Sequence, residues 1–190
     1  LVALAEQLKD KPDTWGIGIG GTHTWGMLPY FWSLGGSITD DKYTKATGYL
    51  NSAGSIAALE TVLSWKNAGL VGPCLFGEQP DTWGGMEAGA YLMIDDGPWY
   101  YSIIGDKALD LTQYAPLPEG KGGSISVVGG EDLVMFTTSK NKPEAWTFMK
   151  YLLSEFPQVT MASVGLIPTV KAIAESPEAQ QTEYVKAYID

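Results

Sequence analysis

The sequence contains no arginine, because all twelve of its basic residues are lysines. Guanidinium groups, which bind phosphates and carboxylates through two parallel hydrogen bonds, are therefore missing from this chain. The 22 acidic residues give a net charge of -10. This charge argues against nucleic acids and anionic membrane surfaces as partners, since both require clustered cations. The composition favours a neutral ligand.

Cysteine and histidine are equally scarce, with one residue of each, Cys74 and His23. A single cysteine cannot form an intrachain disulfide or a metal site. We therefore predict that Cys74 is a small, partly buried hydrophobic residue. His23 is expected at the surface or at a helix start. No nucleophile motif or phosphate-binding loop is present, so the sequence predicts no cofactor, no metal site and no catalytic residue.

Long apolar runs are also missing. No run approaches the roughly 20 residues that cross a bilayer, and no membrane insertion by this segment is predicted. Residues 1–8 have the pattern of the middle of an amphipathic helix. We therefore expect the chain to begin inside a longer protein, so that a signal peptide or lipid anchor is not decided by this sequence.

Short apolar runs alternate with helical patterns, which predicts an α/β fold. Strands are expected at residues 15–20, 91–94, 114–118, 124–128 and 133–137. Helices are expected at 1–10, 24–34, 52–68 and 82–88, after Pro98 and Pro143, and in two stretches near the end. In the 52–68 helix we expect the core face to contain Ile56, Leu59, Leu63 and Trp65. Trp146 is likewise expected in the core.

The segment from Tyr91 to Trp99 carries the strongest local signal. An apolar strand runs into Asp95 and Asp96, and Gly97-Pro98-Trp99 follows. Proline suits the first turn of a helix, where its missing N–H has no cost. The carboxyl end of a strand beside a helix start is a common ligand site in α/β proteins. A large aromatic residue occupies this place, and it either contacts a ligand or packs in the core.

Several further motifs follow one another along the chain. They are Trp32-Ser33-Leu34-Gly35-Gly36, the block from Lys45 to Gly69, Met86-Glu87-Ala88-Gly89 before the Gly-Pro-Trp, Gly129-Gly130-Glu131-Asp132 followed by Ser139 to Trp146, and Ile167-Pro168-Thr169. In this order and spacing they resemble the family 1 extracellular solute-binding proteins, the maltose-binding-protein-like receptors of ABC importers. The resemblance implies a periplasmic-binding-protein-like (type II) lobe, an α/β structure with a mixed sheet flanked by helices.

The resemblance also implies a domain organisation and a role. Residues 1–133 correspond to the C-terminal lobe, 134–164 to an excursion into the N-terminal lobe, and 165–190 to the return. Most of the N-terminal lobe and the closing helices are absent from this sequence. The implied function is capture of a sugar or oligosaccharide between two lobes and its delivery to the ABC permease. The implied location is extracytoplasmic, either periplasmic or as a cell-surface lipoprotein.

In this family the tryptophan of the Gly-Pro-Trp element commonly stacks on a sugar ring. The predicted ligand-binding residues are Trp99, Tyr100, Trp25, Trp83, Gly129, Gly130, Glu131 and Asp96. The four aromatic rings would stack on sugar, the glycines would allow close backbone approach, and the carboxylates would accept hydroxyl hydrogen bonds. The structural alternatives are core packing for the rings, a plain turn for the glycines and solvated side chains for the carboxylates.

Other functions fit parts of the pattern. The ligand can be a different solute, such as a polyamine, a glycerophosphodiester or a metal complex. A glycan-binding or glycan-processing module is a further alternative, in which Asp96 and Glu131 would form a carboxylate pair. Nothing in the sequence shows that these two carboxylates face each other. We therefore favour a binding protein over an enzyme and expect no hydrolysis of glycosides.

Overall fold

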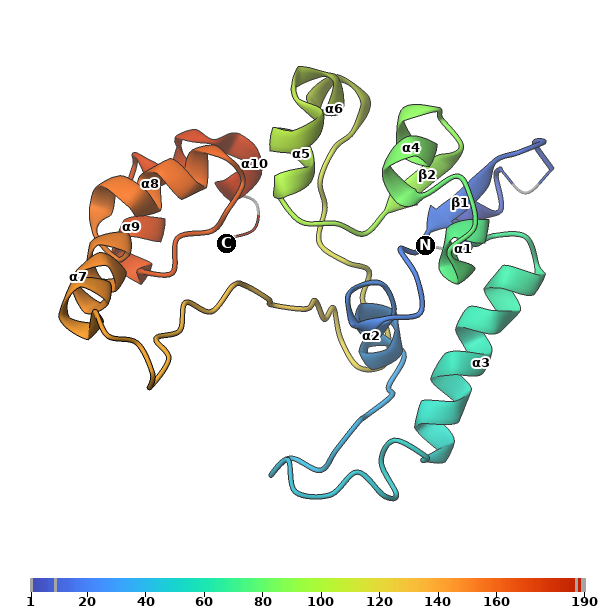
Figure 1. Cartoon of the computed structure of the whole chain (residues 1–190). Helices are drawn as coiled ribbons and strands as arrows, with labels where there is room; N and C mark the ends of the chain where they lie inside the picture. The colour runs from blue at the N-terminus through green and yellow to red at the C-terminus, as the bar shows by residue number, and fades with distance from the viewer. Residues whose placement is uncertain (1, 9, 187, 189–190) are drawn as a thin grey trace. The chain divides into compact units, whose positions relative to one another are not determined.

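The computed structural model describes residues 2–8, 10–186 and 188 (Figure 1). The chain forms two compact units. Unit 1 comprises Leu1–Asp95 and Pro116–Val128, and unit 2 comprises Asp96–Ala115 and Gly129–Asp190. The predicted lobe assignment of residues 1–133, 134–164 and 165–190 concerns the whole protein and stays a prediction.

Unit 1 is built around two parallel strands, β1 (Trp15–Gly18) and β2 (Tyr91–Ile94). Trp15 lies opposite Tyr91 and Ile17 opposite Met93. Val71 adds a single parallel bridge to Ile17. Parallel strands require a long crossover, and the helices between β1 and β2 supply it. The strands predicted at 15–20 and 91–94 and the α/β class are thus confirmed.

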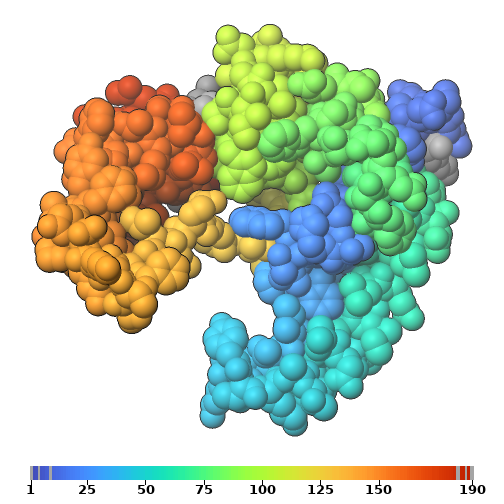
Figure 2. All heavy atoms as spheres, viewed as in Figure 1, coloured from blue at the N-terminus to red at the C-terminus, as the bar shows by residue number. Residues whose placement is uncertain are grey.

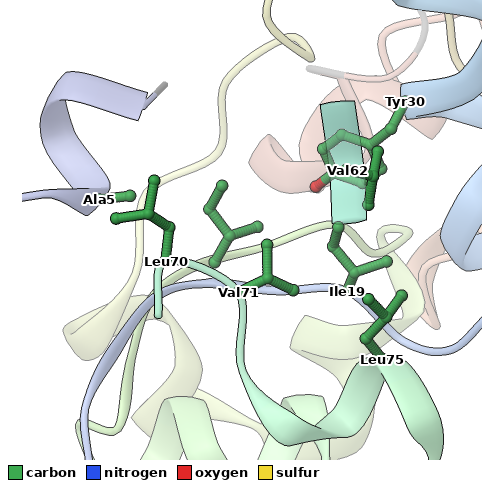
Figure 3. Packing of buried hydrophobic residues seen from close by; sticks show 8 residues of the cluster. Ala5, Ile19, Tyr30, Val62, Leu70, Val71 and Leu75 are labelled. Atoms are coloured by element: carbon green, nitrogen blue, oxygen red, sulfur yellow. The ribbon is translucent and has the colours of Figure 1, made fainter. Parts of the chain in front are cut away.

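Four α-helices accompany this sheet: α1 (Val2–Ala5), α2 (Thr24–Ser33), α3 (Ala53–Asn67) and α4 (Thr82–Glu87). A 3₁₀-helix spans Pro73–Phe76. Their contacts with the strands enclose a core whose members are shown in Figure 3. The buried residues of this core are Ala5, Ile17, Ile19, Tyr30, Val62, Leu70, Val71 and Leu75. The core therefore draws on residues from widely separated parts of the chain.

The predicted core face of α3 is wrong. Ile56, Leu59 and Leu63 are 50%, 46% and 49% exposed, whereas the buried residues of the helix are Ser55, Ala58 and Val62. The Ser55 hydroxyl lies 2.7 Å from the Tyr49 carbonyl and 3.1 Å from the Ser37 carbonyl. These polar contacts orient the small-residue face of α3 inward, where it permits close packing.

Trp65, at the edge of the buried face of α3, packs against the core as predicted. Its ring meets that of Tyr30 edge-on, with centroids 6.5 Å apart. This geometry is a favourable arrangement for two aromatic rings.

Residues 116–128 pass over the end of α2 and form no strand. The Gly122 N–H donates to the Ser33 carbonyl (2.9 Å), and the Ile125 N–H lies 3.3 Å from the Ser33 hydroxyl oxygen. The strands predicted at 114–118 and 124–128 are therefore wrong. A strand needs a neighbouring strand to satisfy its backbone, and this segment bonds to a helix end instead. Residues 133–137 also form no strand, because no partner strand lies beside them within the described residues.

We expect Gly122→Ala to destabilise unit 1 by about 1–3 kcal/mol, as overpacking commonly does. A Cβ at this position would lie 2.0 Å from the Trp32 carbonyl oxygen. Denaturant midpoints measure the effect. Gly130→Ala is the matched control, because nothing lies within 4 Å of its Cβ position. Equal midpoints for the two variants would contradict this account of the contact.

The described residues of unit 2 form helices and no strand. The helices are α5 (Trp99–Ile104), α6 (Asp106–Leu111), α7 (Lys142–Leu152), α8 (Glu155–Ser163), α9 (Lys171–Ala174), a 3₁₀-helix at Ala179–Gln181 and α10 (Glu183–Lys186).

Gln158 is a buried polar residue of α8 that hydrogen-bonds to the segments before and after this helix. Its amide nitrogen donates to the Leu152 carbonyl (2.8 Å), and its amide oxygen accepts from the Thr169 N–H (2.7 Å).

The predicted core position of Trp146 is wrong. Trp146 is 53% exposed, and α7 contains no buried residue. In Figure 2 the orange atoms of the α7 region lie on the molecular surface. The apolar spacing of this helix predicted a buried face, but burial also requires an opposing surface. The described part of the chain does not provide that surface.

Candidate functional site

The carboxyl ends of β1 and β2 lie at the same edge of the sheet in unit 1. Beyond β1 the chain turns through Gly20 and Gly21 into α2. The start of α4 lies beside this turn, since a Cβ on Gly20 would be 3.7 Å from Cγ2 of Thr82. Trp25 and Trp83 are the second residues of α2 and α4. The fold thus brings the two helix starts that carry these predicted rings to one edge.

Trp25 is 44% exposed, and Trp83 is partly buried. An exposed indole at the carboxyl edge of a parallel sheet has the accessibility that stacking on a ligand requires. Asp81 caps α4 by accepting a hydrogen bond from the Gly84 N–H (2.8 Å). This cap holds the first turn of α4, and with it the Trp83 backbone.

The glycine turn determines where α2 begins. Gly21 has a φ of +115°, a conformation that favours glycine. A Cβ on Gly26 would lie 2.7 Å from the Gly21 carbonyl oxygen, so α2 packs directly on the turn. His23 is the exposed residue that precedes the helix, as predicted.

Burial raises the pKa of two ionisable side chains in unit 1. Burial raises the pKa of Tyr30 well above its ordinary value, and the negative charge of Asp95 adds to the effect. Burial also raises the pKa of the Cys74 thiol. Cys74 is a buried free cysteine, which confirms its prediction as a small hydrophobic residue. A neutral buried thiol is a poor nucleophile.

The Gly-Pro-Trp turn lies in unit 2. The Gly97 N–H donates to Oδ1 of Asp96 (2.7 Å), so this predicted ligand-binding carboxylate also stabilises its own turn. Pro98 is the residue before α5, and Trp99 begins the helix. The Trp99 side chain is partly exposed. This exposure is compatible with ligand contact, and that role stays a prediction.

Tyr100 occupies a different environment. It is 3% exposed, and its ring meets that of Tyr101 edge-on with centroids 5.5 Å apart. This burial favours the core alternative for Tyr100. The remaining predicted residues, Gly129, Gly130 and Glu131, are exposed in an irregular stretch of unit 2. Their roles also stay predictions.

A hollow of about 390 Å³ in unit 1 was not predicted from the sequence. Its walls include the rings of Tyr30 and Trp65 and residues Leu117 and Pro118. These residues come from segments far apart in the chain, so no local pattern signals the hollow.

Among the described residues, no group of three or more histidine, cysteine or acidic side chains can hold a metal ion. None of the described helices has the length and apolar character needed to cross a membrane.

Residues 1–187 match the family described as "Bacterial extracellular solute-binding protein". A search of curated proteins found no match.

Two solved structures have similar folds. One is an ABC transporter solute-binding protein from Thermotoga lettingae TMO, bound with alpha-D-tagatose, which is 24% identical in sequence and has a TM-score of 0.70. The similarity covers 86% of this chain and 43% of that protein's chain. The other is the sugar-binding protein MalE from Xanthomonas citri, which is 21% identical in sequence and has a TM-score of 0.73. The similarity covers 98% of this chain and 50% of that protein's chain. These likenesses show the type II periplasmic-binding-protein fold. The chain spans about half the length of either protein.

Proposed function

We propose, on the premise that the chain belongs to the bacterial extracellular solute-binding protein family, that it forms part of the sugar receptor of an ABC importer. The ligand would be a sugar or oligosaccharide, which the whole protein delivers to a membrane permease. The proposed location is extracytoplasmic. The role is binding, with no chemical change to the ligand.

The observation that carries the proposal is the exposed Trp25 in the first turn of α2, the helix that begins at the carboxyl edge of the sheet. Indole faces pack well on the apolar faces of pyranose rings. The absence of arginine fits a neutral ligand. One structural relative is bound with alpha-D-tagatose and the other is a sugar-binding protein, which supports a ligand of this class.

In the proposed mechanism Trp25 and Trp83 supply stacking surfaces in unit 1, and Trp99 supplies one in unit 2. Asp96 and Glu131 accept hydrogen bonds from sugar hydroxyls. Gly129 and Gly130 allow close approach of the backbone.

A thermal-shift screen of the intact protein tests this function. We expect a mono- or oligosaccharide to raise the melting temperature, because a ligand that binds only the folded state stabilises it. Polyamines and glycerophosphodiesters, the alternative ligand classes, should have no such effect. Trp25→Ala should abolish the shift, and Trp25→Phe, which keeps an aromatic face, should retain part of it. Stabilisation by a polyamine alone would contradict the sugar proposal.

A further inference from the structure

The indole of Trp99 lies back on Gly97 within unit 2. A Cβ built on Gly97 would be 2.2 Å from both Cη2 and Cζ3 of Trp99 and 2.5 Å from Cζ2. These three atoms form the outer edge of the six-membered ring. The ring therefore occupies the space in which any other residue would place its side chain. This orientation of the indole is open only because residue 97 is glycine.

The backbone that carries Trp99 is held by the segment that follows α8. A Cβ on Gly165 would lie 2.7 Å from the Pro98 carbonyl oxygen and 2.8 Å from Cα of Trp99. The Ser102 hydroxyl oxygen is 2.7 Å from the Val164 carbonyl oxygen and 3.0 Å from that of Trp99. Close packing and hydrogen bonding together restrain the turn on this side.

The residue before the turn is restrained as well. The Asp96 carbonyl accepts a hydrogen bond from the Tyr188 hydroxyl (3.1 Å), and the Asp96 side chain accepts one from the Gly97 N–H. The turn is thus attached to the rest of unit 2 both before and after Gly97. An atom added at Gly97 would meet a backbone that resists movement and a ring edge that can rotate away.

We infer that Gly97 is a positioning residue for Trp99, and that its missing Cβ sets the orientation in which the indole is presented to ligand. The inference rests on the proposed function for the role of the ring in binding. Gly97 and Gly165 should therefore respond differently to substitution by alanine. Gly97→Ala displaces the far end of a side chain, whereas Gly165→Ala forces a new atom against backbone.

Fluorine NMR of the intact protein labelled with 5-fluorotryptophan tests the inference without any ligand. The Trp99 resonance is the one that Trp99→Phe removes. We expect Gly97→Ala to shift this resonance by more than its line width while the melting temperature stays close to that of the parent protein. Gly165→Ala should lower the melting temperature more than Gly69→Ala. Gly69 is the matched control, because each of the two glycines follows the C-cap residue of a helix and has a positive φ. Of the two, Gly165 alone has atoms within 4 Å of its Cβ position.

An unchanged Trp99 resonance in Gly97→Ala would overturn the inference. Failure of Gly97→Ala to fold would also overturn it, because the ring is required to yield before the backbone does. A shifted resonance confirms positioning whether or not sugar binds. If the resonance shifts and a sugar that binds the parent protein binds Gly97→Ala with equal affinity, the proposed role of Trp99 fails and the positioning inference stands.

Discussion

Gly85→Ala is expected to destabilise unit 1 by about 1–3 kcal/mol, the usual cost of an added atom in a well-packed site. A Cβ on Gly85, within α4, would lie 2.2 Å from Cε2 and 2.4 Å from Cδ2 of Tyr91. The opposite edge of the same ring faces Gly72, where a Cβ would lie 2.2 Å from Cε1. The Tyr91 hydroxyl also donates to the Pro80 carbonyl (2.6 Å). The ring therefore has no free direction in which to move.

Gly84→Ala is the control for this prediction, because it changes the adjacent residue of the same helix. Its Cβ would meet nothing nearer than Oδ1 of Asp81 at 3.4 Å, which is an ordinary contact. Alanine is a better helix former than glycine, so we expect a gain of about 0.5–1 kcal/mol. Midpoints of chemical denaturation for the two variants should move in opposite directions. Shifts of the same sign would show that Tyr91 does not restrict Gly85.

Trp99→Ala is expected to weaken sugar binding by the intact protein by about 1–3 kcal/mol, a scale borrowed from aromatic stacking on nucleic-acid bases. Trp99 is partly exposed at the start of α5, so its replacement should leave the fold in place. Calorimetric titration at low and high ionic strength measures the loss. The affinity should depend only weakly on salt, because the chain has no arginine to bind a charged ligand.

Trp99→Phe separates stacking from simple loss of volume, since it keeps an aromatic face and should retain part of the affinity. A polyamine, one of the alternative ligands, would give a different result. A polyamine would be attracted by the net charge of -10, and salt would weaken its binding strongly. Steep salt dependence together with a nearly neutral Trp99→Ala would reject sugar stacking.

Features that depend on neighbouring residues could be predicted from the sequence alone. The helix expected at residues 52–68 is observed as α3, where Ser52 caps the start by accepting from the Ser55 N–H and Gly69, with a φ of +73°, follows the last turn. The strand that ends before Asp95 and the helix that begins at Trp99 were also recognisable. These signals are local because caps, turns and strand ends are made by residues only a few positions apart. The ordered motifs likewise identified the family, which the match over residues 1–187 confirms.

Which surfaces are buried and which extended segments pair depends on contacts between distant parts of the chain. Periodicity showed that α3 has an apolar side, but the contacts of Ser55 with Ser37 and Tyr49 placed that side in solvent. Residues 124–128 have strand-forming composition, yet Ser33 at the end of α2 supplies a hydrogen-bond partner there. The packing of Trp99 on Gly97 and of Tyr91 between two glycines was equally hidden, because glycine spacing does not reveal which ring will occupy the vacant Cβ position. Burial and pairing depend on partners far away in the chain, and only folding brings those partners into contact.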